Sequence, residues 1–184
     1  MKKKLIPTIE GNRIYFSEVN RTDFSEIANC LKHTLGNFDF DSGLGEPNET
    51  LIQNHYNESV HNPDWLFWVI REKTEKKPLV GISDVRLNHP QADEATIELL
   101  LIDQQLQNQG YGHEALQAIE QMIFGKVRLV RLGVNPKNKI AKDFWEKENY
   151  TSAQNPYERE TRQLWYAKSR NWYERLKGRI FSYG

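Results

Sequence analysis

The sequence is short of cysteine, of net charge and of long apolar runs. Its 184 residues include 1 cysteine, so Cys30 cannot form an internal disulfide, and no cysteine pair exists for a zinc ribbon or a redox motif. The 25 basic residues balance 25 acidic ones, so no overall field attracts nucleic acid. The apolar runs are far shorter than the roughly 18 residues that a membrane span needs. We therefore expect a cytoplasmic protein with no membrane or nucleic-acid partner.

The start and the length of the chain predict one domain without a targeting segment. The basic start, MKKKLIP, is not followed by the apolar core of a signal peptide. With roughly 150 residues per domain as a guide, residues 1–184 form a single domain. A chain of this length buries about 70% of the surface that it exposes when unfolded, which is enough to fold without a disulfide. The 5 histidines show no metal-ligand spacing, so we interpret them as surface or packing residues and expect no metal.

Apolar periodicity and turn signals predict the order of the elements. We expect strands at residues 13–19, 65–72, 79–87, 95–102, 127–134, 150–153 and 163–167, and helices at 24–35, 51–60, 112–124, 138–148 and 169–177. An antiparallel hairpin comes early, and strands alternate with helices after about residue 95. This order predicts an α/β fold with a mixed, mostly antiparallel central sheet flanked by helices.

A strand rich in leucine and isoleucine runs into Gln107-x-x-Gly110-x-Gly112, where a helix begins. Glycine lets the backbone approach a ligand closely, and the first N–H groups of a helix have no internal acceptor. The pattern predicts a pyrophosphate cradle, although a plain strand–turn–helix connection also accounts for two glycines. Adding Ala115 gives a relaxed dinucleotide fingerprint, but residues 133–136, GVNP, lack the carboxylate that such a site requires. We disfavour a nucleotide-binding oxidoreductase for this reason.

A second block of residues follows the glycine turn at 134–150, VNPKNKIAKDFWEKENY. Together the turn and this block resemble the GCN5-related N-acetyltransferase (GNAT) family, whose second block is a strand, an asparagine, a short helix and an aromatic residue. Two blocks at this separation are much more specific than either alone. The resemblance implies a GNAT-like fold and an N-acetyltransferase that takes acetyl-CoA as its acyl donor.

The resemblance also implies which residues hold acetyl-CoA. Backbone N–H groups of the turn before the helix would bind the pyrophosphate, and main-chain groups at the end of the preceding strand would pair with the pantetheine arm. Asn138 would hydrogen-bond the pantetheine or adenylate side, although it also suits an N-cap of the next helix. The expected acetyl-CoA set is Leu100, Leu101, Ile102, Gln107, Gln109, Gly110, Tyr111, Gly112, His113 and Asn138.

Glu98 is the candidate base for removing the proton of an amine acceptor. An alkyl amine with a pKa near about 10 is protonated at neutral pH, so a base is required. Glu98 lies in an otherwise apolar strand, where burial would raise its pKa toward a useful value. The alternatives are that Glu98 lies at the exposed start of the strand or pairs with Arg86 or Arg71. A backbone N–H of the same strand would hold the oxyanion.

The general acid for the leaving thiolate is less clearly marked. Many family members place a tyrosine in the second block, and here that position is Trp145, whose indole N–H is a donor but not a usable acid. Tyr111 or Tyr150 could substitute, or the thiolate leaves unassisted. The alternative is a non-catalytic acyl-CoA-binding module that acts as a sensor or in an interaction.

Two charged tracts flank the predicted core. Residues 36–50 hold four carboxylates and no base, and in this family such a loop borders the acceptor site, which makes Asp39 and Asp41 candidate acceptor-binding residues. A solvated loop is the simpler interpretation. The tail, residues 169–184, is basic and aromatic. Docking on its own sheet or on a partner subunit explains the aromatic residues better than nucleic acid does, so a homodimer stays open.

The acidic loop predicts a cationic acceptor, either a small molecule or a peptide. We expect Asp39→Asn combined with Asp41→Asn to raise the KM for the acceptor and to leave the KM for acetyl-CoA unchanged. The attraction is electrostatic and solvent-exposed, so the effect shrinks as salt rises. Steady-state kinetics at low and high salt measure both constants. A neutral or acidic best substrate, or an unchanged acceptor KM at low salt, would show that the loop is only a connection.

Overall fold

The computed structural model describes residues 9–35, 48–157 and 162–174 of the chain. The elements occur in the predicted order, with two short 3-10 helices added and a last helical turn that begins at residue 170. They are β1 (Ile14–Glu18), η1 (Arg21–Asp23), α1 (Phe24–Leu35), α2 (Glu49–Ser59), β2 (Trp65–Glu72), β3 (Leu79–Leu87), β4 (Glu94–Ile102), η2 (Gln104–Leu106), α3 (Tyr111–Ile123), β5 (Leu129–Val134), α4 (Lys139–Lys147), β6 (Thr151–Ala153) and β7 (Leu164–Ser169).

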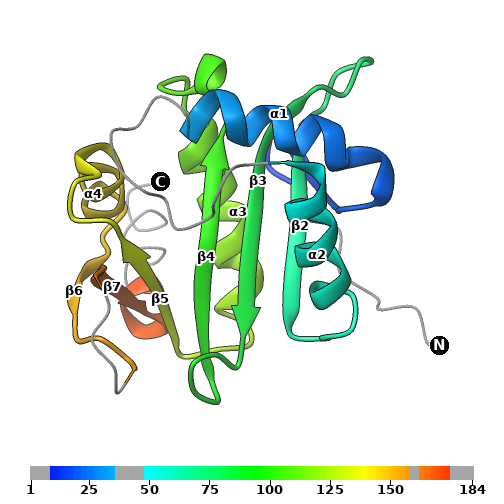
Figure 1. The fold of residues 1–184 in the computed structure, drawn as a ribbon. Coiled ribbons are helices and arrows are strands. Elements are labelled where there is room, and N and C mark those ends of the chain that lie inside the picture. The colour runs from blue at the N-terminus through cyan, green and yellow to red at the C-terminus, as the bar shows by residue number, and fades with distance from the viewer. Residues whose placement is uncertain (1–8, 36–47, 158–161, 175–184) are drawn as a thin grey trace.

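The strands form one seven-stranded sheet in the order β1-β2-β3-β4-β5-β7-β6 (Figure 1). Every neighbouring pair is antiparallel except β4 and β5, which are parallel. The predicted mixed, mostly antiparallel sheet is therefore confirmed. The parallel pair is connected through α3, as a parallel crossover requires.

Helices cover both faces of the sheet. Figure 1 shows α1 and α2 on one face and α3 on the other. The buried apolar residues accordingly form two clusters. One packs α1 and α2 onto β2 to β4, and includes Ile27, Leu31 and Ile52. The larger one packs α3 onto the opposite face, and includes Leu116 and Ile119.

Most element ends follow from local chemistry that the sequence already contains. Asn20 forms a capping box with Asp23 before α1, and Asn48 caps α2 by accepting from the N–H of Leu51. The predicted strand 127–134 starts two residues later, because the N–H of Val127 still donates to Ile123 O and prolongs the turn after α3.

None of the helices in the described ranges is long and apolar enough to cross a membrane.

A buried ion pair connects α3 to β7. Lys168 Nζ lies 2.8 Å and 2.9 Å from the two carboxylate oxygens of Glu120, and both side chains are 4% exposed. The ammonium also donates to Glu148 O at 3.1 Å. Burial raises the pKa of Glu120, and the neighbouring Lys168 opposes that rise. The pair therefore fixes β7, which lies between β5 and β6 in the second half of the sheet, to the central helix.

Removing one partner of this pair should destabilise the fold strongly. Lys168→Met leaves Glu120 buried without a counter-charge, so we expect the free energy of unfolding at pH 7 to fall by about 3–5 kcal/mol in urea titrations. Adding Glu120→Leu should restore most of that loss. Lys139→Met, which removes the exposed pair with Asp143, is the matched control and should change stability by about 0.5 kcal/mol or less. A loss below about 1 kcal/mol for Lys168→Met would contradict this account.

Candidate active site

The two parallel strands at the centre of the sheet separate soon after they meet. Their ladder joins only residues 94–96 of β4 to residues 129–131 of β5. Beyond that point β4 pairs with β3 alone as far as Ile102, and β5, which pairs with β7 along its whole length, diverges from β4, as Figure 1 shows. Within the described ranges, no strand covers the other edge of β4 from Ile97 onward. Leu100, Leu101 and Ile102, which we expect to pair with pantetheine, lie along this open edge.

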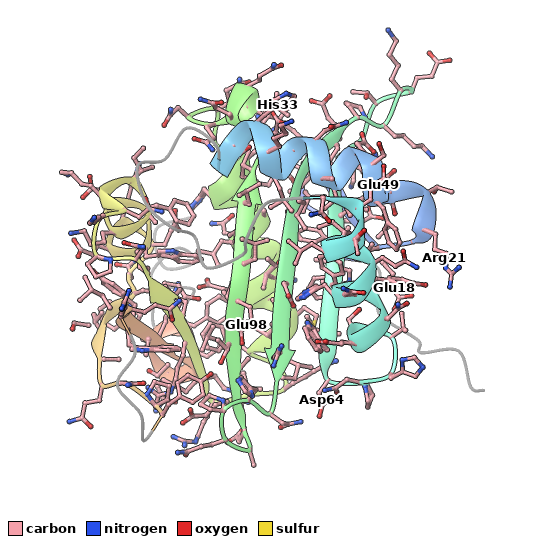
Figure 2. The ribbon with its side chains drawn as sticks, viewed as in Figure 1. Glu18, Arg21, His33, Glu49, Asp64 and Glu98 are labelled. Atoms are coloured by element: carbon pink, nitrogen blue, oxygen red, sulfur yellow. The ribbon has the colours of Figure 1, made fainter. Side chains whose placement is uncertain are left out.

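A β-bulge places Glu98 beside the open edge. Asp84 of β3 pairs with Leu99 and Val85 pairs with Ile97, so Glu98 has no partner in the ladder. Ile97 packs into the cluster on the α3 face, whereas Leu99 packs into the cluster under α1 and α2. Glu98 consequently faces the side of α1 and α2, where Figure 2 shows it on β4.

Glu98 is partly shielded and lies among basic groups. Its carboxylate oxygen is 3.8 Å from Arg86 Nε and 3.7 Å from His89 Nε2, and its side chain is 36% exposed. Burial raises its pKa above the ordinary value, and the Arg86 guanidinium offsets part of that rise. Glu98 lies in the middle of β4 and not at its start. The alternative pairing with Arg86 is realised loosely, while Arg71 instead contacts Asp23 and Glu26.

The glycine turn before α3 has a left-handed backbone at Gly110. Gly110 occupies the N-cap position with φ 85° and gives the helix no side-chain cap, so the first N–H groups face outward. The Gln107 side chain donates to Ile102 O at 3.0 Å and holds the turn against the end of β4. Gln109 donates to Gln105 O at 3.0 Å. A Cβ at Gly112 would lie 3.4 Å from the Phe144 ring, so the backbone is close to α4.

Arg13, which precedes β1, contacts this turn while it forms an ion pair with Glu114 in the first turn of α3. Its guanidinium donates to Gln109 O at 3.2 Å and to Glu114 at 2.8 Å, and it lies 4.1 Å from the Tyr111 ring centre. Sequence reasoning missed Arg13, because it is 96 residues away from Gln109 in the chain. Its cationic end suits the anionic ligand that the helix N-terminus favours.

The remaining predicted acetyl-CoA residues have partners of their own. Asn138 accepts from the N–H of Ala141 at 2.9 Å, so it is the N-cap of α4, a role that does not exclude the expected contact with the ligand. His113 contacts the Glu148 carboxylate at 2.7 Å and stays half exposed at the start of α3. His113 lies in the first turn of α3, and Asn138 lies at the N-terminus of α4.

Tyr111 and Trp145, two of the three aromatic residues considered for the thiolate, lie away from Glu98, and the third, Tyr150, is buried in the same cluster on the α3 face. The Tyr111 hydroxyl donates to Glu72 at 2.5 Å, and the ring is buried on the α3 face. Trp145 is buried on that same face and packs against Phe144 and Tyr150. The structure brings neither of them together with Glu98. Tyr111 keeps its place in the turn, but its hydroxyl is engaged away from the open edge.

A tyrosine that sequence reasoning did not single out does reach this region. The Tyr157 hydroxyl lies 2.9 Å from His89 Nε2, which is itself 3.7 Å from Glu98. Burial and the nearby Arg86 lower the pKa of His89. Tyr157 follows β6, so only the return of the chain across the sheet brings its hydroxyl near β4.

A second polar cluster lies beside Glu98 on the same face. Asp84 of β3 is buried, and its carboxylate accepts from Trp65 Nε1 at 2.5 Å and contacts His55 Nε2 of α2 at 2.5 Å. Arg86 lies over the Trp65 ring at 3.7 Å. The alternation of Asp84 and Arg86 in an apolar strand was the one available signal for this cluster. His55, interpreted as a surface or packing residue, does pack against Trp65 and Phe67, and it also contacts Asp84, which the sequence did not indicate.

The acidic loop and most of the C-terminal tail lie outside the part of the chain that the structure describes. Asp39 and Asp41 lie outside the described residues, as does most of the tail after residue 174. Among the described residues, no group of three or more histidine, cysteine, aspartate or glutamate side chains could hold a metal ion.

Residues 32–150 match the family model described as acetyltransferase (GNAT) family. The chain belongs to the GNAT acetyltransferase family. None of the curated proteins matches the sequence. Membership makes the chain an acetyltransferase, and the relatives of this family act with acyl-CoA on amine acceptors.

Solved structures share the fold at low sequence identity. An acetyltransferase from Thermus thermophilus has a TM-score of 0.72 and 20% identity, covering 85% of this chain and 97% of its own. The PaiA N-acetyltransferase from Thermoplasma acidophilum, in complex with coenzyme A, has a TM-score of 0.68 and 14% identity, covering 85% and 98%. A spermidine N-acetyltransferase SpeG chimera from Vibrio cholerae and hSSAT has a TM-score of 0.70 and 14% identity, covering 89% and 99%.

Filling the glycine turn should abolish acetyl-CoA binding. Gly112→Val would crowd Phe144 and Ile102 and push side-chain atoms toward the outward-facing N–H groups, so we expect the Kd for acetyl-CoA in calorimetry to rise about tenfold or more. Gly110→Val should act likewise, with added strain from its positive φ. Gly125→Val is the matched control, because a Cβ there meets only Met122 O at 3.6 Å. Unchanged affinity in a folded Gly112→Val protein would refute this placement.

Proposed function

We propose that the protein transfers the acetyl group of acetyl-CoA to a primary amine by direct attack in a ternary complex, with Glu98 as the base. One observation carries the proposal: a partly shielded carboxylate at a β-bulge adjoins the unpaired edge of β4, next to the glycine turn. A base and an open main-chain edge are the two features that the reaction requires of the protein.

The described residues fit acetyl-CoA. Backbone N–H groups at Gly110 to His113, with Arg13 beside them, suit the pyrophosphate, and the open edge of β4 suits an extended pantetheine arm. When bound, acetyl-CoA supplies the acetyl group as a thioester together with its thiolate leaving group. The comparison structure that holds coenzyme A shares this fold, which supports the same use of the turn.

The chain's own groups then handle the protons. Glu98 takes one proton from the acceptor ammonium, and the freed amine nitrogen bonds to the acetyl carbon as the carbon–sulfur bond breaks. A backbone N–H on the open edge of β4 stabilises the charge that develops on the carbonyl oxygen. The ammonium loses two protons in all and the thiol product keeps one, so each turnover releases one proton.

The acceptor reaches Glu98 as a cation at its reacting end. An ammonium is attracted by the Glu98 carboxylate and, in our proposal, by Asp39 and Asp41 of the acidic loop. The structural relative that is a spermidine N-acetyltransferase supports an amine as the acceptor. The competing function, an acyl-CoA-binding module without catalysis, rests on Trp145 being buried at the usual tyrosine position.

Neutralising Glu98 should slow the reaction without weakening acetyl-CoA binding. We expect Glu98→Gln to lower kcat about 100-fold or more, the range of general-base catalysis, with an unchanged Kd for acetyl-CoA. In the wild type the rate should fall as pH drops through the pKa of Glu98, because only the deprotonated carboxylate accepts a proton. Burial raises that pKa above the ordinary carboxyl range. This acidic limb should be lost in Glu98→Gln.

The measurement is thiol release from acetyl-CoA against a panel of amines across pH. Glu58→Gln, which alters an exposed carboxylate on α2, is the control and should keep the wild-type rate and profile. A Glu98→Gln protein with the wild-type rate and profile would return Glu98 to a structural role. Tight acetyl-CoA binding with no thiol release for any amine would favour the non-catalytic module.

A further inference from the structure

We infer that the acceptor carries a carboxylate close to its amine, and that Arg86 binds this carboxylate while the amine faces Glu98. The acceptor class is then an amino acid with a cationic side chain, such as lysine, or another compact aminocarboxylate of net positive charge, and not a simple amine or polyamine. This inference rests on the proposed function and adds the part of the acceptor that does not react.

Arg86 presents donors that the protein leaves unused. Within the described residues its guanidinium makes no hydrogen bond, and its Nε is shielded from solvent without a partner. The nearest acid oxygen, on Glu98, is 3.8 Å from Nε, which is beyond hydrogen-bond distance. A guanidinium with a free planar fork is the group that binds carboxylates in two parallel hydrogen bonds.

The protein holds this guanidinium in place by packing. Arg86 lies over the Trp65 ring at 3.7 Å, and Trp65 Nε1 donates to the buried Asp84 at 2.5 Å. The second oxygen of Asp84 contacts His55 at 2.5 Å, and the His55 ring packs edge-on against Trp65 and Phe67. Side chains from β2, β3 and α2 therefore fix the cation without consuming its donors. A preorganised but unsatisfied arginine suits a ligand better than it suits the fold.

The charges that remain available have opposite signs and lie close together. Both oxygens of Asp84 already have partners, so Asp84 does not compete for an acceptor cation. On this face Glu98 offers a negative charge and Arg86 a positive one, 3.8 Å apart, and His89 lies 3.7 Å from Glu98. An ammonium and a carboxylate on neighbouring carbons match this separation. A diamine would bring its second cation toward Arg86, where like charges repel.

Binding of a carboxylate at Arg86 would also make Glu98 a stronger base. Without an acceptor, the Arg86 guanidinium opposes the rise in the pKa of Glu98 that burial causes. A carboxylate at Arg86 neutralises that influence, so Glu98 takes up a proton more readily when the correct acceptor is present. Discrimination between acceptors then comes from both binding and proton transfer.

The experiment compares matched acceptors that differ only in the carboxylate. Thiol release from acetyl-CoA is measured for glycine, glycinamide and methylamine, and for lysine, lysinamide and cadaverine. We expect kcat/KM for an amino acid to exceed that for its amide by about 10- to 100-fold, the range for a hydrogen bond to a charged group. In Arg86→Gln this ratio should fall to near one. Arg86→Lys, which keeps the charge without the planar fork, should give an intermediate ratio.

Arg21→Gln is the matched control. Arg21 is exposed in η1 and lies on the far side of α2 from Glu98 (Figure 2), so the ratio and the rates should stay at the wild-type values. Circular dichroism and the Kd for acetyl-CoA report whether each variant is folded. If Arg86→Gln does not fold, the wild-type ratio together with Arg86→Lys still decides.

The outcomes separate this inference from the function on which it rests. Amides or diamines acetylated as well as the amino acids would overturn the carboxylate site and leave amine acetylation standing. An unchanged ratio in folded Arg86→Gln would overturn the role of Arg86. Failure of every amine, with acetyl-CoA bound, would refute the proposed function and this inference with it.

Discussion

The short parallel contact between β4 and β5 is the constraint on which the site depends. Glu94, at the start of β4, is buried and accepts from Arg131 at 2.7 Å and from Arg128 at 3.1 Å, both on the β5 side. This clamp holds the two strands together at one end only. Past residue 96 this edge of β4 has no strand partner among the described residues, so its main-chain groups are left unpaired by the sheet there.

The bulge places Glu98 beside this open edge. In a regular strand Glu98 and Leu99 would lie on opposite faces, and one of them would have to enter the wrong environment. The extra residue lets Leu99 join the core beneath α1 and α2 while Glu98 stays on that same face, at the boundary of solvent. The carboxylate is therefore shielded enough to have a raised pKa and open enough to meet a substrate.

The two faces of the sheet differ in how their charged side chains are paired. On the α3 face the aromatic residues Tyr111, Trp145 and Tyr150 pack in the core, and Lys168 neutralises Glu120 inside it. The buried charges of this pair are matched, as burial demands. On the other face Arg86 keeps its donors, because Trp65 stabilises its cation through the ring and not through a hydrogen bond. The unused guanidinium donors thus lie on the face that carries Glu98.

The sequence alone determined the local features of this protein. Glycines at 110 and 112, a leucine-rich strand before them and an asparagine cap after the next strand act over a few residues, so their spacing predicted the turn, the helices and the place of Glu98 in its strand. Only the tertiary structure decided what surrounds Glu98. Arg86, His89, His55 and Tyr157 come from separate parts of the chain, and Arg13 meets the glycine turn across 96 residues. Such contacts depend on strand order, on a bulge and on where two strands part, and none of these leaves a period or a motif in the chain.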